Sequence, residues 1–368
     1  MRLTYYFAQT FVVVGLLTTL LRSTPVVLRI QVWLWALSVG FIAWQFGIEE
    51  QLDFYSNDQR YYSFVVEMFS HDPLLALREI SVVSAKAPYT LPAVVLTLFG
   101  IHPTLALKII SLLSLLVLSS LVLNSVNTRS LSRQTRMLYL TGCGAIGLFF
   151  SVLALRETSM MLFTYTYAFG KSAQVRILSL VTVYLLRPHL AVALIVAEFV
   201  TTIWRWLTSR RNAGYWSVPA IVLSTLTLGG VIFSQTIPAH LEPVPVINSF
   251  AIAQMTRFFS NYVGLQFLTV PESTVNFPIL TLVLLRILLS ETFVVVTVFI
   301  VTSILMSFRL RERGVFALAA FSTYVSVVTN TDFNSFRQNI PFVPLIGILL
   351  VGMIERDSRR APAIRLIT

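Results

Sequence analysis

Residues 103–123 read PTLALKIISLLSLLVLSSLVL, an almost unbroken apolar run. A helix needs about 20 mostly apolar residues to cross the hydrocarbon core of a bilayer. The whole chain shares this character, because 56% of its 368 residues are hydrophobic and 12% are charged, with a mean hydropathy of +0.79. A soluble domain has about 25% charged residues. The sequence therefore predicts an all-α integral membrane protein and excludes a soluble enzyme carried by a membrane tether.

Further apolar runs predict about eleven transmembrane helices, some short or broken, in a single transmembrane domain over residues 1–368. The predicted spans are 5–21, 26–47, 103–123, 137–154, 158–169, 175–186, 189–207, 216–233, 277–307, 315–329 and 340–354. The segment 88–100 begins at Pro88 and contains Pro92, and it is predicted to be a half-helix that enters the membrane. Short or broken helices are tolerated where they are buried in protein or line a wet cavity.

Basic residues predict the orientation of the chain, whose net charge is +11. They cluster in five places between or after the spans: Arg22 and Arg29; Arg129, Arg133 and Arg136; Arg205, Arg210 and Arg211; Arg309, Arg311 and Arg313; and Arg356, Arg359, Arg360 and Arg365. Cytoplasmic loops carry an excess of Lys and Arg. We therefore expect these clusters, with Lys171 and Arg176, in the cytoplasm. The N-terminus then lies outside, with a first outer loop at 48–102 and a second at 234–276.

The first outer loop contains the sequence Ser-Asn-Asp-Gln-Arg-Tyr-Tyr at residues 56–62. Asp58 precedes a pattern of apolar residues on one helical face, which are Tyr61, Phe64, Val65, Met68 and Phe69. Two interpretations stay open. Asp58 caps a helix that lies flat on the membrane, or it is a general base that deprotonates an acceptor hydroxyl at the membrane surface.

Residues 57–64 (NDQRYYSF), 88–92 (PYTLP) and 99–100 (FG) together resemble the GT-C superfamily of polytopic glycosyltransferases, including EpsG-like and Wzy-like polysaccharide polymerases. In that superfamily the first outer loop carries an Asp or Asp-Glu pair, an amphipathic helix and a re-entrant Pro-Tyr-Pro-like turn. Gln59 departs from the Asp-Glu form. The resemblance implies a GT-C-like fold, a polyprenyl-linked sugar donor, a site on the outer membrane face and Asp58 as the base.

Arginines at the predicted outer ends of spans, and Arg286 inside the predicted span 277–307, form a second constellation. The predicted phosphate- or glycan-binding residues are Arg60, Arg156, Arg187, Arg286 and Arg337, together with Tyr89. An arginine at a helix centre costs at least about 2.5 kcal/mol on insertion scales, so several such groups indicate a shared polar cavity. The planar guanidinium donates two parallel hydrogen bonds to phosphate. For single arginines two alternatives stay open, a local ion pair for Arg156 and snorkelling to the interface for Arg187 and Arg337.

His189 follows Pro188 at a predicted helix start and is the second catalytic candidate, as an acid, a base or a phosphate donor. A structural histidine is the alternative. The single cysteine, Cys143, excludes an intrachain disulfide and a cysteine metal site. No cofactor and no metal ligand set is predicted, although the carboxylates leave a divalent metal open. The polar segment 330–339 is either a glycan contact or a solvated turn.

These observations predict a membrane glycosyltransferase in surface polysaccharide synthesis, either a repeat-unit polymerase or a single-sugar transferase. The expected partners are a polyprenyl-linked sugar donor, a glycan or lipid-linked acceptor and membrane lipids, and no nucleic acid. The expected location is a bacterial inner (plasma) membrane, with the site facing the periplasm or the exterior. The alternatives are a lipid-linked glycan flippase or transporter, which predicts matched broken helices in two related halves, and a non-catalytic membrane subunit.

Overall fold

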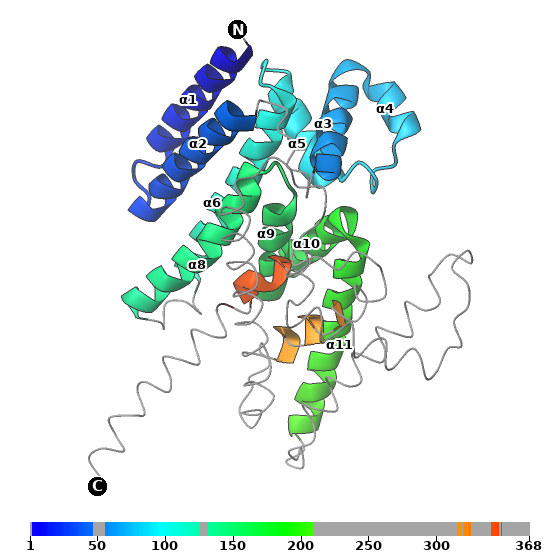
Figure 1. The fold of residues 1–368 in the computed structure, drawn as a ribbon. Coiled ribbons are helices and arrows are strands. Elements are labelled where there is room, and N and C mark those ends of the chain that lie inside the picture. Colours follow the sequence, from blue (N-terminus) through cyan, green and yellow to red (C-terminus); the bar gives the residue numbers. More distant parts are fainter. Residues whose placement is uncertain are drawn as a thin grey trace, which may run out of the picture. The chain divides into compact units, whose positions relative to one another are not determined.

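The structure, a computed structural model, describes residues 2–46, 56–125 and 132–209, with short stretches between 315 and 347. Within these ranges every regular element is a helix (Figure 1), which confirms the all-helical expectation for the described residues. The longer helices are α1 (Arg2–Leu20), α2 (Val26–Phe46), α3 (Ser56–His71), α4 (Pro73–Glu79), α5 (Ala87–Thr97), α6 (Pro103–Asn124), α8 (Arg133–Val152), α9 (Glu157–Phe169), α10 (Ala173–Leu186) and α11 (Pro188–Ser209).

Four described helices are long and apolar enough to cross a membrane. These segments are Leu3–Leu20, Val26–Trp44, Pro103–Asn124 and Pro188–Trp206. Shorter apolar helices accompany them in α5, in the second half of α8 and in α10. The helices therefore support a membrane protein, while eleven spans and a GT-C-like arrangement stay predictions. The predicted spans 216–233 and 277–307 lie outside the described residues, and 315–329 and 340–354 lie only partly within them.

The chain divides into two compact units, residues 1–186 with 347–368, and residues 187–346. The first unit, called unit 1 below, contains α1 to α10. The second, called unit 2, contains α11 and the described stretches between 315 and 345. Apolar periodicity predicted most of these helices to within a few residues, but it did not predict α4, which has seven residues and begins at Pro73.

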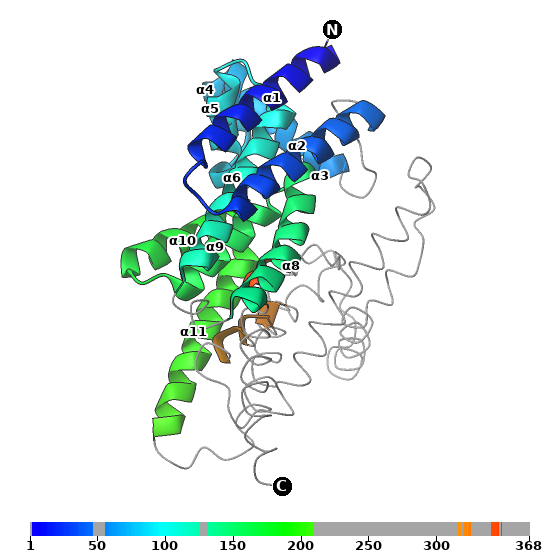
Figure 2. The ribbon, with the colours of Figure 1, turned by 90° about the vertical axis from the view of Figure 1, so that its left-hand side faces the viewer.

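Helix α6 is the centre of unit 1, since it packs against α2, α3, α5, α8 and α9. Two hydrogen bonds fix the register between α6 and the segment that contains α9. Ser111 Oγ donates to the carbonyl oxygen of Leu155 at 2.9 Å, and the hydroxyls of Ser114 and Ser159 lie 2.9 Å apart. Residue numbers rise together along the two helices, so α9 runs parallel to α6. Figure 2 shows α9 and α10 as a short helical hairpin beside α6.

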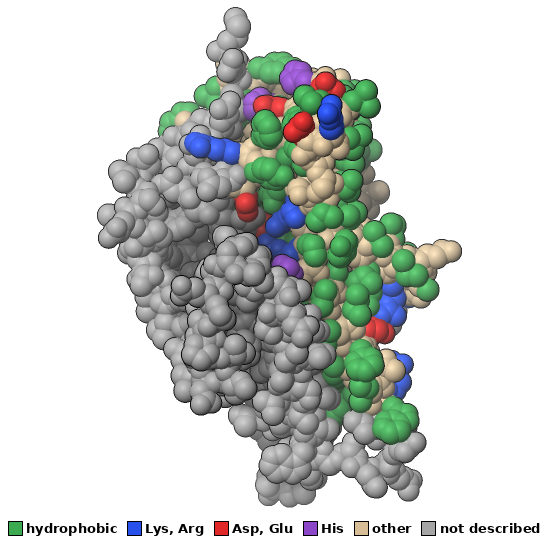
Figure 3. Space-filling view, turned by 90° about the vertical axis from the view of Figure 1, so that its right-hand side faces the viewer, with side chains coloured by type: hydrophobic (Ala, Val, Ile, Leu, Met, Phe, Trp, Pro, Cys, Tyr) green, Lys and Arg blue, Asp and Glu red, His purple; other side chains and the backbone are tan. Residues whose placement is uncertain are grey.

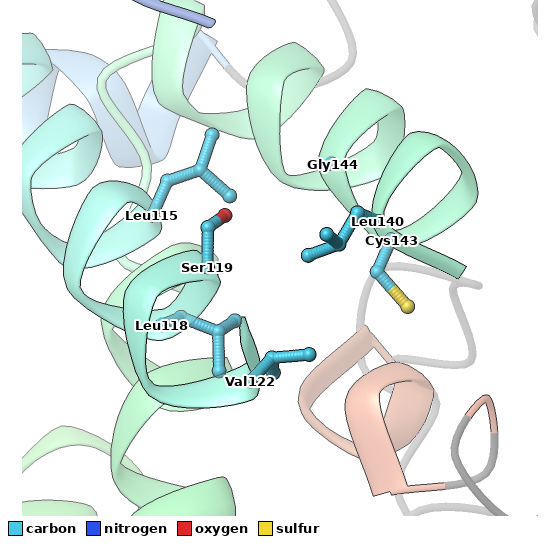
Figure 4. A pocket seen from close by; sticks show the side chains of 7 residues that line it. All are labelled: Leu115, Leu118, Ser119, Val122, Leu140, Cys143 and Gly144. Atoms are coloured by element: carbon cyan, nitrogen blue, oxygen red, sulfur yellow. The ribbon is translucent and has the colours of Figure 1, made fainter. Parts of the chain in front are cut away.

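Helix α8 approaches α2 and α6 closely through two glycines. A Cβ atom on Gly144 would lie 2.9 Å from Gln31 Nε2, and one on Gly147 would lie 2.5 Å from a methyl carbon of Leu115. The same Gln31 amide donates to Ser119 Oγ at 3.1 Å. Small residues and polar side chains are the usual means of joining helices in membranes. A small apolar pocket remains between α6 and α8 (Figure 4).

Helix α1 is tied to the turn between α5 and α6 by one side chain. Gln9 Nε2 donates to the carbonyl oxygen of Gly100 at 2.5 Å, and Gln9 Oε1 accepts from the backbone N–H of His102 at 3.2 Å. The turn needs a glycine, because Gly100 has a φ of +80°. The start of α1 therefore lies at the same end of unit 1 as the start of α6.

The two ends of unit 1 carry different charges. At the end formed by α3 and α4, acidic, basic and histidine side chains mix with exposed apolar ones (Figure 3). The described basic residues at the opposite end, where α6 finishes, are Arg22, Arg29, Arg136, Lys171 and Arg176. The described acidic residues of unit 1 lie elsewhere, on α3, on α4 and at the start of α9. The described basic residues that were expected in the cytoplasm thus gather at one end of unit 1, while the side of the membrane that this end faces stays a prediction.

Candidate functional site

Asp58 lies in the first turn of α3 and is half-buried. A carboxylate in this position is stabilised by the positive end of the helix dipole. The neighbouring side chains divide between two environments, because Gln59 is 5% exposed whereas Arg60 faces solvent. Helix α3 packs against α5 and α6 through its buried face. Asp58 therefore sits at the edge of this packed interface, and Arg60 points away from it.

The turn between α8 and α9 lies directly against this part of α3. Leu153, Ala154 and Leu155 are all 0% exposed, and Ala154 has a φ of 54°. An L-residue in this left-handed conformation costs roughly 1–2 kcal/mol. Hydrogen bonds hold the turn on both sides of Ala154. Gln59 Nε2 donates to the carbonyl oxygen of Leu153, and Ser111 Oγ donates to that of Leu155.

Arg156 follows this turn and caps α9. Its Nη1 donates to the carbonyl oxygen of Leu186, at the end of α10, at 2.8 Å. Its Cζ lies 5.7 Å from the centre of the Tyr62 ring, within the range of a cation–π interaction. The guanidinium is thus held from two directions and remains half-buried.

The structure brings Asp58 and Arg156 to the same region of unit 1. Asp58 and Tyr62 are four residues apart in α3, so their side chains are neighbours on one helical face. The Arg156 guanidinium is held on the Tyr62 ring, so its contact with α3 is made through the residue four positions after Asp58. This region therefore contains a carboxylate, a group that serves as a general base in many enzymes, and a planar donor that fits phosphate.

Tyr89 lies beneath this arrangement. It is 0% exposed, and its hydroxyl lies 3.1 Å from Ser111 Oγ and donates to the carbonyl oxygen of Leu107 at 3.3 Å. Its ring lies 5.5 Å from the Tyr62 ring at an interplanar angle of 83°. Tyr89, predicted as a substrate contact, is thus a buried residue whose ring packs against Tyr62.

Tyr61, on the exposed side of α3, donates to the carbonyl oxygen of Ser84 at 3.1 Å. Partial burial raises the pKa of the Tyr61 phenol above its ordinary value of 10.0. The phenol therefore stays protonated at neutral pH and remains a donor. This bond joins α3 to the segment before α5, which limits the movement of the α3 end that carries Asp58.

The site lies inside the helical bundle, set back along α6 from the end of that helix that begins at Pro103. Ser111 contacts the α8–α9 turn and comes eight residues after Pro103, which corresponds to about 12 Å along a helix. Helix α9 has 13 residues, about 20 Å, and runs parallel to α6 from that level. The turn and Arg156 are thus set back from the end of α6 that begins at Pro103.

Two buried charged residues of this region were not proposed as site residues from the sequence. Lys108 and Glu157 are both 0% exposed. Lys108 shares a face of α6 with Thr104, whose hydroxyl lies 3.2 Å from that of Ser63 on α3, and with Ser111. Lys108 is the only charged residue in the predicted span 103–123, and an ionisable residue within a span indicates a functional site. Lys108 could therefore have been predicted as a candidate site residue from the sequence.

Arg187 and His189 belong to unit 2. Arg187 is half-buried, and its Nη1 donates to the hydroxyl of Tyr324 at 2.8 Å. The Tyr324 ring is fully buried and lies 5.3 Å from the Phe342 ring. His189 is the second residue of α11 and is exposed. Arg187 is therefore fixed by a residue far along the chain, whereas His189 faces outward.

Several predicted features lie outside the described residues, namely Arg286, Arg337 and the segments 234–276 and 330–339. Among the residues that are described, no group of three or more His, Cys, Asp or Glu side chains is placed to hold a metal ion. The pocket between α6 and α8 contains none of the predicted site residues, since its lining is Leu115, Leu118, Ser119, Val122, Leu140, Cys143 and Gly144.

The chain matches no family model, no curated protein and no solved structure.

Proposed function

We propose that this protein is a membrane glycosyltransferase that moves a sugar or oligosaccharide from a polyprenyl-phosphate or polyprenyl-diphosphate donor to an acceptor hydroxyl. The observation that carries the proposal is that Arg156 is held on the ring of Tyr62, which follows Asp58 by four residues in α3. This group lies about 12 Å along α6 from its first residue, among apolar helices. A donor with a lipid tail reaches such a position from the bilayer, where a sugar nucleotide is not dissolved.

The proposed reaction uses both residues. The acceptor oxygen attacks the anomeric carbon of the donor sugar, and the bond from that carbon to the phosphate oxygen breaks. The acceptor proton passes to the Asp58 carboxylate as the new bond forms. The phosphate leaves with its lipid, and Arg156 stabilises the negative charge that develops on it. The products are a glycoside and a free polyprenyl phosphate or diphosphate.

The remaining predicted residues have supporting roles in this proposal. Arg187, Arg286 and Arg337 are further phosphate ligands, and Arg60 contacts the glycan. His189 assists proton transfer. Tyr89, which is buried under Tyr62, keeps that ring in place. Each of these roles can be tested by a separate substitution, because the proposed chemistry depends on Asp58 and Arg156.

The proposed location is a bacterial inner membrane, with the α3–α4 end of unit 1 on the periplasmic side. The basic residues at the opposite end of unit 1 support this orientation, because positively charged loops stay in the cytoplasm. The proposed process is the synthesis of a surface polysaccharide. In that process the donor glycan is presented on the outer leaflet, on the same side as Asp58.

The proposal is tested with the purified full-length protein in nanodiscs, incubated with a set of undecaprenyl-diphosphate-linked sugars and analysed by mass spectrometry. We expect a glycosidic product from the wild-type protein and at least about 100-fold slower product formation from Asp58→Asn or Arg156→Ala. A matched control is Arg176→Ala, because Arg176 also lies over a tyrosine ring, that of Tyr167 at 5.1 Å, at the other end of α9. Wild-type rates from both site variants would overturn the site. In proteoliposomes, translocation of the intact lipid-linked glycan without product would favour the flippase alternative.

A further inference from the structure

We infer that Gln59 is a positioning residue that fixes Arg156 by holding the α8–α9 turn in its left-handed conformation. The inference rests on the proposed function only in taking a lipid phosphate as the ligand of Arg156. Gln59 is 5% exposed, and its side-chain amide reaches across from α3 to the carbonyl oxygen of Leu153. Its Oε1 accepts no hydrogen bond from the described residues, so the N–H donor is the group that makes the contact.

The turn needs this support because its central residue is alanine. Ala154 has a φ of 54°, a conformation that glycine adopts freely and that alanine adopts at a cost of roughly 1–2 kcal/mol. A hydrogen bond between neutral partners contributes about 0.5–1.5 kcal/mol. The bonds from Gln59 and Ser111 flank Ala154 and together match the cost of the left-handed conformation.

Arg156 follows the turn directly, so its position depends on the backbone of Leu153 to Leu155. If Ala154 relaxes to a negative φ, the direction of the chain into α9 changes. The guanidinium then leaves its place between the Tyr62 ring and the Leu186 carbonyl. Gln59 and Tyr62 both project from the first two turns of α3. The same helix therefore holds the turn and supplies the ring on which the guanidinium lies.

Two substitutions separate the donor from the shape of the side chain. Gln59→Glu keeps the shape and replaces the N–H donor with a second acceptor, which repels the Leu153 carbonyl. Gln59→Leu removes the hydrogen bond without adding charge. The conservative variant Gln59→His keeps an N–H donor. We expect the loss of affinity for undecaprenyl phosphate to be largest for Gln59→Glu, intermediate for Gln59→Leu and smallest for Gln59→His.

A second-site change tests the mechanism itself. Ala154→Gly makes the left-handed conformation inexpensive, so the double variant Gln59→Leu/Ala154→Gly is expected to recover most of the lost phosphate affinity. The matched control is Lys86→Gly, because Lys86 is the other described non-glycine residue with positive φ, 53°, and lies at the start of α5. Relief of strain at Lys86 is expected to leave the Gln59→Leu defect unchanged.

The experiment measures two quantities on the full-length protein in nanodiscs. The first is the affinity for undecaprenyl phosphate by native mass spectrometry, with an expected loss of about tenfold for Gln59→Leu. The second is hydrogen–deuterium exchange in peptides that cover residues 152–157, which is expected to quicken in Gln59→Leu and to slow again in the double variant. Recovery by Ala154→Gly and not by Lys86→Gly supports the inference.

Other outcomes overturn it. Unchanged exchange in Gln59→Leu shows that Gln59 does not hold the turn, whatever the activity. Faster exchange with unchanged phosphate affinity shows that the turn does not position Arg156. Both results leave the proposed function standing if Arg156→Ala still loses phosphate binding. If Arg156→Ala binds undecaprenyl phosphate as well as the wild type does, the proposed phosphate site fails, and the role of Gln59 at that site fails with it.

Discussion

The guanidinium carbon of Arg156 lies 5.7 Å from the centre of the Tyr62 ring, although the two residues are far apart in the sequence. The ring and the Leu186 carbonyl hold the guanidinium in one place before any ligand arrives. A preorganised donor loses little conformational freedom when it binds an anion. The geometry of the arginine fork is therefore as important as its charge.

Arg156→Lys tests this distinction. Lysine keeps the positive charge but lacks the planar fork that donates two parallel bonds. We expect Arg156→Ala to reduce turnover by about 100- to 1,000-fold, the typical loss when one donor to a developing negative charge is removed. Arg156→Lys is expected to recover only part of this loss. The measurement is the initial rate of product formation from a lipid-linked donor. Equal rates for Lys and Arg would show that charge alone is sufficient.

Substitution of Tyr62 tests the ring. Tyr62→Phe keeps an aromatic face under the guanidinium, whereas Tyr62→Leu removes it. A cation–π contact contributes about 0.5–2 kcal/mol, so we expect Tyr62→Leu to weaken phosphate binding by about 2- to 30-fold. Tyr62→Phe is expected to stay closer to the wild type. If Phe and Leu weaken binding equally, the hydroxyl rather than the ring is the important group.

Gly147→Val tests the close approach of α8 to α6. A Cβ atom at this position would lie 2.5 Å from a methyl carbon of Leu115, which is 1% exposed. Overpacking of this kind costs about 1–3 kcal/mol. We expect a lower Tm in detergent for Gly147→Val. Gly142→Val is the control on the same helix, because no atom lies within 4 Å of its Cβ position apart from its chain neighbours and the nearby backbone of α8 itself. Equal losses from the two variants would show that the effect does not come from the contact with Leu115.

Cysteine labelling tests the orientation. In a Cys143→Ser background, single cysteines replace Ser81 near α4 and Ser172 between α9 and α10, both of which are exposed. A membrane-impermeant maleimide added to spheroplasts is expected to label the cysteine at residue 81 and to leave the one at residue 172 unlabelled until the membrane is permeabilised. The reverse pattern would place the basic end of unit 1 outside and move Asp58 to the cytoplasm.

Most helices of unit 1 could be predicted from the sequence because apolar periodicity is a local property. The predicted spans 103–123 and 158–169 correspond to α6 and α9 within one residue at each end. Helix α4 was missed because seven residues are too few to establish a period. The half-helix expected at 88–100 is α5, and it ends at Thr97 because Leu98 to Gly100 form the turn before α6.

The site was less predictable because its contacts join residues that are distant in sequence. The sequence singled out Asp58 and Arg156 by residue type, but nothing in it indicated that the Tyr62 ring would hold the Arg156 guanidinium. The left-handed turn could not be predicted either, since Ala154 disfavours the conformation that it adopts. Gln59 was noted only as a departure from a family pattern, and its contact with Leu153 depends on the packing of α3 against the α8–α9 turn.

The shortness of α9 and α10 has a consequence for the biogenesis of the protein. Each is about 20 Å long, against about 30 Å of hydrocarbon, so neither is a stop-transfer segment by itself. We therefore expect the two helices to insert together as one hairpin, since they pack against each other and α9 packs on α6.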